Sequence, residues 1–108
     1  MKLNLDEILF NFNGEPMQED GKPLTLKNTI LNALGAPDKD AKGEEKLKRY
    51  KLGMKITNGG AIDLKTEEVA SIKKRVSEVY FLPIIIGEVD RIIEGQHGEH
   101  TTDDDSKS

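Results

Sequence analysis

The apolar and polar positions near the N-terminus alternate in the pattern of a β-hairpin. Residues 8–12 read Ile-Leu-Phe-Asn-Phe, so every second side chain would lie on one face of a strand. That shared face would consist of Ile8, Phe10 and Phe12. Asn13-Gly14 follows and tolerates the positive φ of a tight turn. The returning strand, 16–19, would lie at a sheet edge because Pro16 cannot donate to a ladder.

Beyond residue 24 the apolar positions change to the 3.6-residue period of amphipathic helices. The first helix would begin at Thr25, a good N-cap, and stop at Gly35, ahead of Pro37. Its buried side chains would be Leu26, Ile30, Ala33 and Leu34. The second helix would run from about 44 to 56. Its predicted buried stripe consists of Leu47, Tyr50 and Met54.

Two further helices are predicted in the second half of the chain. Thr66 would cap the third, and Pro83 would occupy the first turn of the fourth, which would end at Gly95. The stripe of the third helix would comprise Val69, Ile72, Val76, Val79 and Tyr80, with Lys73, Lys74 and Arg75 pointing away. The buried face of the fourth would comprise Ile85, Ile86, Val89, Ile92 and Ile93.

Together these elements predict an α+β fold in which an N-terminal β-hairpin packs against about four α-helices. Residues 61–64 could form a third short strand that adds to the hairpin. A single small domain would cover residues 1–95. The polar, acidic tail, 96–108, has nothing to bury and would be disordered.

Composition limits the chemistry that this domain could perform. The chain has no Cys, which excludes disulfides and thiolate catalysis, and it carries neither a signal-like segment nor an apolar run long enough to span a bilayer. It is therefore expected to be soluble and intracellular. Much of the net charge of −4 lies in the tail, so the domain itself is nearly neutral and the totals predict no strong field for nucleic acid.

Two groups of residues imitate metal sites, but neither predicts one. Residues 38–43 begin like a calcium loop, but the twelfth position, where a bidentate Glu is needed, holds Arg49. His97 and His100 lie in the flexible tail, where ordering them around a metal would cost too much entropy. We therefore expect no metal, no cofactor and no catalytic residues, which points to a non-enzymatic protein.

Two surfaces are candidates for binding a partner. The apolar excess at 81–93 exceeds what one helix can bury, so Phe81, Leu82, Ile84 and Ile85 could form a protein-binding surface. The competing interpretation is a central helix that is packed on both sides. The second candidate is a basic face for nucleic acid, formed by Lys48, Arg49, Lys51, Lys55, Lys73 and Lys74. Interleaved glutamates favour an ordinary solvated, ion-paired surface over this alternative.

The order of short sequence features resembles a group of small proteins encoded by tailed bacteriophages and prophages. The features include Asn-Gly-Glu-Pro at 13–16, Asp-Gly-Lys-Pro-Leu-Thr-Leu at 20–26, Glu-Lys-Leu-Lys-Arg-Tyr at 45–50 and Arg-Ile-Ile-Glu at 91–94. The similarity spans about residues 3–95. It implies an assembly, morphogenesis or accessory protein that lies in the host cytoplasm or is associated with the virion.

The resulting hypothesis is a phage-type protein that acts through protein–protein contact, with self-association into a homo-oligomer as a further expectation. The alternative is a nucleic-acid-binding regulator that uses the basic faces of the second and third helices. No membrane partner is expected.

Overall fold

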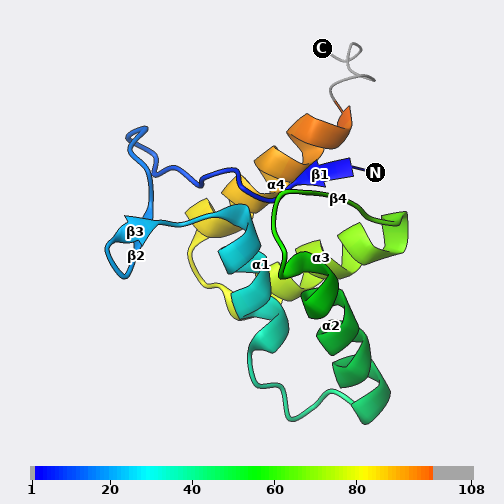
Figure 1. Cartoon of the computed structure of the whole chain (residues 1–108). Coiled ribbons are helices and arrows are strands. Elements are labelled where there is room, and N and C mark those ends of the chain that lie inside the picture. The colour runs from blue at the N-terminus through cyan, green and yellow to red at the C-terminus, as the bar shows by residue number, and fades with distance from the viewer. Residues whose placement is uncertain (1, 99–108) are drawn as a thin grey trace.

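A computed structural model describes residues 2–98 of the chain, with the side chains of residues 97 and 98 left aside. Four helices and two pairs of short strands form an α+β fold, as the sequence predicts (Figure 1). The elements in chain order are β1 (Lys2–Asn4), β2 (Gln18–Glu19), β3 (Lys22–Pro23), α1 (Leu26–Gly35), α2 (Gly43–Ile56), β4 (Ala61–Asp63), α3 (Thr66–Val79) and α4 (Pro83–Gly98).

The helix α1 packs against both α2 and α3, and α4 packs against α3 and β1. The core between these elements is aliphatic: within the described chain, the buried apolar residues are all Leu, Ile, Val or Ala. Many of them are completely excluded from solvent, including Leu3, Leu9, Ile30, Ile72 and Ile93. Close packing of these branched side chains is the main source of stability.

The N-terminal hairpin exists, but its turn lies farther along the chain than Asn13-Gly14. Strands β2 and β3 pair antiparallel around Asp20-Gly21, whose φ values of 53° and 79° are those of a tight hairpin turn. The segment before β2 contributes only two isolated bridges, Ile8 to Thr25 and Phe10 to Pro16. The alternation at 8–12 thus correctly indicated extended chain, but not the position of the ladder.

The face shared by Ile8, Phe10 and Phe12 is the more exposed face of this segment. Leu9 donates its backbone N–H to Leu24 at 3.0 Å and accepts one from Met17 at 2.8 Å. These contacts place the Leu9 side chain in the core, so its neighbours in the period-two pattern turn the other way. Phe10 and Phe12 are consequently exposed.

Residues 61–63 form a strand, but it does not join the hairpin. Strand β4 pairs antiparallel with β1, with Leu3 opposite Ile62, in a separate two-stranded sheet. Gly59 and Gly60, both with φ near 70°, turn the chain from α2 into β4. The last part of α4 lies beside the same sheet, where the Gln96 side chain accepts a hydrogen bond from the backbone N–H of Asn4 at 2.6 Å.

The first and third helices bury the faces that their periodicity predicts. In α1, Leu26, Ile30, Ala33 and Leu34 are buried, and Thr25 Oγ1 caps the helix by accepting from the Asn28 N–H at 3.1 Å. In α3, Ile72 and Val76 are buried while Val69, Val79 and Tyr80 are half-buried. The predicted cap Thr66 is instead the first helical residue, and the Glu68 carboxylate accepts from the N–H of Lys65 at 2.8 Å.

The helix α4 continues beyond its predicted stop at Gly95 and reaches Gly98. Ile85, Val89, Ile92 and Ile93 are buried as expected, and Ile86 is half-buried. Residues 96–98, predicted to begin the disordered tail, therefore still have helical backbone. The rest of that predicted tail, which includes His100, lies outside the described residues.

Candidate interaction surfaces

The predicted protein-binding residues lie at the turn between α3 and α4, but they do not form one exposed surface. Phe81 is 92% exposed and Leu82 is 55% exposed. Ile84 is half-buried, and Ile85 is buried in the core, which corrects its assignment as a contact residue. We use the name corner surface for Phe81 and Leu82.

The geometry of this turn explains why two adjacent apolar side chains point outward. Tyr80 ends α3 in an extended conformation, and Pro83 begins α4 two residues after Phe81. The Tyr80 hydroxyl lies 3.4 Å from the carbonyl oxygen of Thr29, and burial of the ring raises the pKa of the phenol. Tyr80 and Ile85 therefore hold the two ends of the turn, while Phe81 and Leu82 between them face solvent.

A second aromatic segment, which carries Phe10 and Phe12, lies beside α4. The backbone N–H of Phe10 donates to the carboxylate of Glu88, in the second turn of α4, at 2.9 Å. A hydrogen bond from Arg91 is the main reason that the pKa of Glu88 is lowered, and the Phe10 N–H contributes in the same direction. All three phenylalanines of the chain, Phe10, Phe12 and Phe81, are thus exposed, and the two segments that carry them lie beside the start of α4.

The predicted stripe of α2 is on the wrong side of the helix. Leu47, Tyr50 and Met54 are 51%, 62% and 55% exposed, whereas Leu52 and Ile56 are buried. The packed face continues to Gly53, where an added Cβ would lie 3.8 Å from the Leu31 side chain of α1. Both faces of α2 carry apolar residues, so periodicity alone could not identify the buried one. We use the name α2 stripe for Leu47, Tyr50 and Met54.

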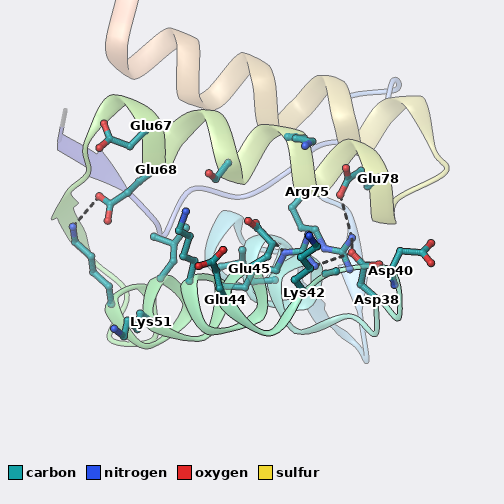
Figure 2. A pocket seen from close by; sticks show the side chains of 18 residues that line it. Asp38, Asp40, Lys42, Glu44, Glu45, Lys51, Glu67, Glu68, Arg75 and Glu78 are labelled. Carbon is teal, nitrogen blue, oxygen red and sulfur yellow. Dashed lines mark hydrogen bonds and ion pairs between the residues drawn. The ribbon is translucent and has the colours of Figure 1, made fainter.

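A cleft of about 940 Å³ separates α2 from α3 (Figure 2). Leu34, Ala41 and Leu52 contribute apolar side chains to its lining. Its charged lining residues are evenly divided in sign: Lys42, Lys48, Arg49, Lys51, Lys55, Lys74 and Arg75 against Asp38, Asp40, Glu44, Glu45, Glu67, Glu68 and Glu78. The cleft therefore has no net formal charge to attract a polyanion.

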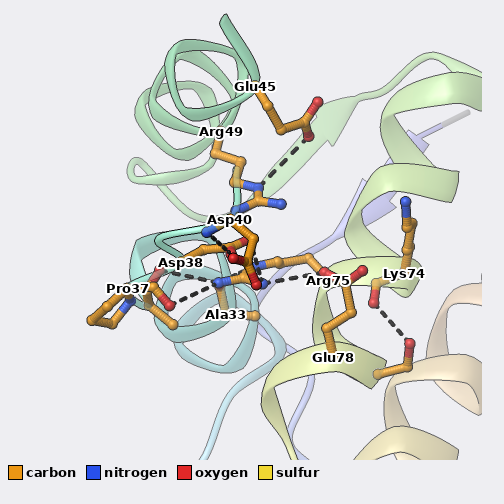
Figure 3. A network of polar contacts seen from close by, with 11 residues as sticks. Ala33, Pro37, Asp38, Asp40, Glu45, Arg49, Lys74, Arg75 and Glu78 are labelled. Carbon is orange, nitrogen blue, oxygen red and sulfur yellow. Dashed lines mark hydrogen bonds and ion pairs between the residues drawn. The ribbon is translucent and has the colours of Figure 1, made fainter. Parts of the chain in front are cut away.

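One end of this cleft is closed by a polar network around Arg75 (Figure 3). The prediction that Arg75 points away from the core was wrong, because its side chain is buried. The guanidinium donates to the carbonyl oxygens of Ala33 at 3.0 Å and Ala36 at 3.1 Å, and it pairs with Glu78 at 3.2 Å. Burial of an arginine is compensated here by a nearly complete set of acceptors.

Asp38 connects this network to α2. Its carboxylate pairs with Arg49 at 2.9 Å and with Arg75 at 3.4 Å. The hydrogen bond from Arg49 is the main cause that lowers the pKa of Asp38, and the Asp40 N–H adds to it. Asp38 is the first position of the calcium-like segment and Arg49 the twelfth. Arg49 thus binds the carboxylate that would otherwise be a calcium ligand.

The structure does not bring the six predicted nucleic-acid contacts onto one surface. Five of them line the cleft: Lys48, Arg49, Lys51, Lys55 and Lys74. Of these, Arg49 pairs with Asp38 and Lys55 pairs with Glu68 at 3.0 Å. Lys73 instead faces α4, where it pairs with Asp90 at 3.2 Å and with Glu94. Burial disfavours its charged form, but hydrogen bonds to Glu94 and Asp90 raise the pKa of Lys73.

Among the side chains that the structure describes, those of residues 2–96, no group of three or more acidic residues is placed to hold a metal ion. No helix within residues 2–98 is both long and apolar enough to cross a membrane. No protein-family model matches the chain, and neither the curated proteins nor the solved structures include a significant match.

Proposed function

We propose that this protein is a non-enzymatic binding module that recognises another protein through the corner surface. The observation that carries the proposal is the exposure of Phe81 and Leu82 on a domain whose core is aliphatic. Large aromatic and aliphatic side chains supply much of the binding energy at protein interfaces when a partner covers them. Their position outside the core therefore favours a role in recognition.

The way the corner is held also supports recognition. Tyr80 and Ile85 fix the chain on either side of Phe81 and Leu82, and each neighbouring helix packs on the core. A contact surface that is already ordered loses less conformational entropy on binding. The exposed Phe10 and Phe12 segment, tied to Glu88 of α4, could extend the area that a partner covers.

The nucleic-acid alternative has weaker support. Phosphate contacts need unpaired cations arranged along one surface. Here acidic side chains in the cleft balance the basic ones, and Arg49, Lys55 and Lys73 are each held by a carboxylate. No observation on the described residues favours a polyanion over a protein partner.

The resemblance to phage and prophage proteins leads us to place this binding role in phage assembly or its accessory regulation. The site of action would then be the host cytoplasm or the virion.

Affinity capture from infected or lysogenic bacteria tests the proposal. We expect the wild-type chain to retain a protein that Phe81→Ser/Leu82→Ser loses, and we expect this binding to change little with salt. Lys39→Ser is the control, because it changes an exposed loop residue that belongs to neither apolar surface. The proposal is contradicted if the double variant retains the same proteins as the wild type, or if binding weakens steeply with salt as phosphate contacts do.

A further inference from the structure

The α2 stripe is an apolar surface that the proposed corner interaction does not use. Leu47, Tyr50 and Met54 lie on the side of α2 opposite the buried Leu52 and Ile56. In Figure 1, α2 lies at the periphery of the molecule, away from α4. This stripe has the composition and spacing of a buried face, which is why the sequence alone predicts it in the core.

The shape of the stripe indicates what kind of surface would cover it. Its three residues are spaced i, i+3 and i+7, so they form a single narrow line along two turns of the helix. A line of this kind is complementary to the side of another helix that carries the same spacing. A second copy of α2 provides such a helix.

Charges beside the stripe select an arrangement of the two copies. By helical periodicity, Glu44 and Lys51 lie seven residues apart along one edge of the stripe, the edge next to the cleft (Figure 2). Both are exposed, and neither makes an ion pair within the described part of the chain. Lys46 lies along the other edge.

We propose that the protein self-associates through a two-fold symmetric, antiparallel pairing of α2 with α2 of a second copy. In this arrangement each edge of the stripe meets the same edge of the second copy. Glu44 of each copy then faces Lys51 of the other, which forms two equivalent ion pairs. A parallel pairing would instead place Lys46 of one copy against Lys51 of the other and would be repulsive.

The register that these ion pairs set also satisfies the apolar residues. Leu47 of one copy lies against Tyr50 of the other, and the same contact is repeated by symmetry. Met54 reaches the N-terminal end of the opposite helix at Gly43, around which there is open space. The helix can therefore be approached closely at the point where the long Met54 side chain needs room.

The size of this contact sets its expected strength. A stable interface buries roughly 800 Å² on each partner. One helix face with three apolar side chains covers less than this, so the association should be weak and dependent on protein concentration. A weak dimer of this kind could present two corner surfaces to a partner without being obligatory for folding.

Sedimentation equilibrium over a dilution series, at low salt, tests the proposal. We expect the wild-type chain to show a monomer–dimer equilibrium, and we expect Tyr50→Ser to remove it. Glu44→Lys and Lys51→Glu should each weaken self-association by about tenfold, because each replaces two attractive contacts with two repulsive ones. An equimolar mixture of these two variants should associate again, because one copy then carries only lysine along the edge and the other only glutamate.

Recovery of association in the mixture is specific to the antiparallel pairing. It also requires both variants to be folded, and circular dichroism of each variant checks that folding independently. A strictly monomeric wild-type chain, or a mixture that stays monomeric, would overturn the proposal. Binding of a different protein to the stripe without self-association would overturn it as well. Phe81→Ser/Leu82→Ser should leave the monomer–dimer equilibrium unchanged, so this test is separate from that of the corner surface.

Discussion

Arg75 on α3 donates a hydrogen bond of 3.0 Å from its Nε to the carbonyl oxygen of Ala33, near the C-terminal end of α1. The last carbonyls of a helix have no partner within the helix and carry partial negative charge. The Arg75 guanidinium meets this need, since it also reaches the carbonyl of Ala36 and the carboxylate of Asp38. One side chain therefore joins α1, the following loop and α3.

Replacing Arg75 by Met should destabilise the fold strongly. The change removes the guanidinium donors from the carbonyls of Ala33 and Ala36 and one of the two cations beside Asp38, so the free energy of unfolding should fall by about 2–4 kcal/mol. Urea denaturation followed by circular dichroism measures this loss. Lys74→Met is the matched control on the adjacent, exposed position, where a change within about 0.5 kcal/mol is expected. Equal effects of the two substitutions would show that the Arg75 network does not stabilise the fold.

The orientation of α2 can be tested by replacing a leucine on each of its two faces, the buried Leu52 and the exposed Leu47. Leu52→Ala should lower the free energy of unfolding by about 2–4 kcal/mol, because it leaves a cavity in the core. Leu47→Ala should change it by less than about 0.5 kcal/mol, because the side chain already contacts water. Chemical denaturation of both variants in dilute solution, where self-association is minimal, makes this comparison. The reverse order of the two effects would contradict the orientation of α2.

Stability should fall in acid partly because Asp38 loses its charge. Its pKa in the folded protein lies below the ordinary value of 3.8, so the stabilisation it supplies is fully present above that value. It is lost as the pH falls through the lowered folded pKa. The difference in Tm between the wild type and Asp38→Asn should therefore be largest near neutral pH and shrink below about pH 4. Thermal unfolding across this range is the measurement, and a constant difference would argue against an ionised Asp38 in the network.

The start of α1 depends on a side-chain cap. Thr25→Ala removes the acceptor of the Asn28 N–H and should reduce the free energy of unfolding by about 1 kcal/mol. Thr25→Ser keeps the hydroxyl oxygen and should retain most of that stability. Both variants lack the Thr25 Cγ2 methyl group, and only Thr25→Ser keeps the hydroxyl. The difference in stability between them, measured by thermal or urea unfolding, therefore reports the cap alone.

The apolar residues around Pro83 show which exposed side chains the sequence could indicate and which it could not. Phe81 and Leu82 could be identified as a surface because more apolar residues surround Pro83 than one helix face can bury. Ile85 was assigned both to the buried face of the fourth helix and to the contact surface, and the packing of α4 against α3 and β1 decides for the buried face. Alternation put Phe10 and Phe12 on one face but could not say whether that face is buried, because the pairing of Leu9 with Leu24 and Met17 decides it.

The buried arginine was missed for a related reason. On α3, Arg75 lies next to the apolar Val76, and nothing in the local pattern distinguishes it from Lys73 or Lys74. Its acceptors are the carbonyls at the end of α1, about forty positions earlier in the chain. The signal that could have indicated it is Asp38, an acidic residue immediately after the predicted helix stop and Pro37.

The sequence by itself determined the four helices, their approximate ends and the α+β class, because caps, Gly and Pro stops and hydrophobic period act over a few neighbouring residues. Tertiary structure decided which face of α2 is buried, which turn closes the hairpin and which strand accepts β4. These choices depend on contacts between segments far apart in the chain. Leu52 and Leu47 are equally apolar, and only the position of α1 decides which of them is removed from water.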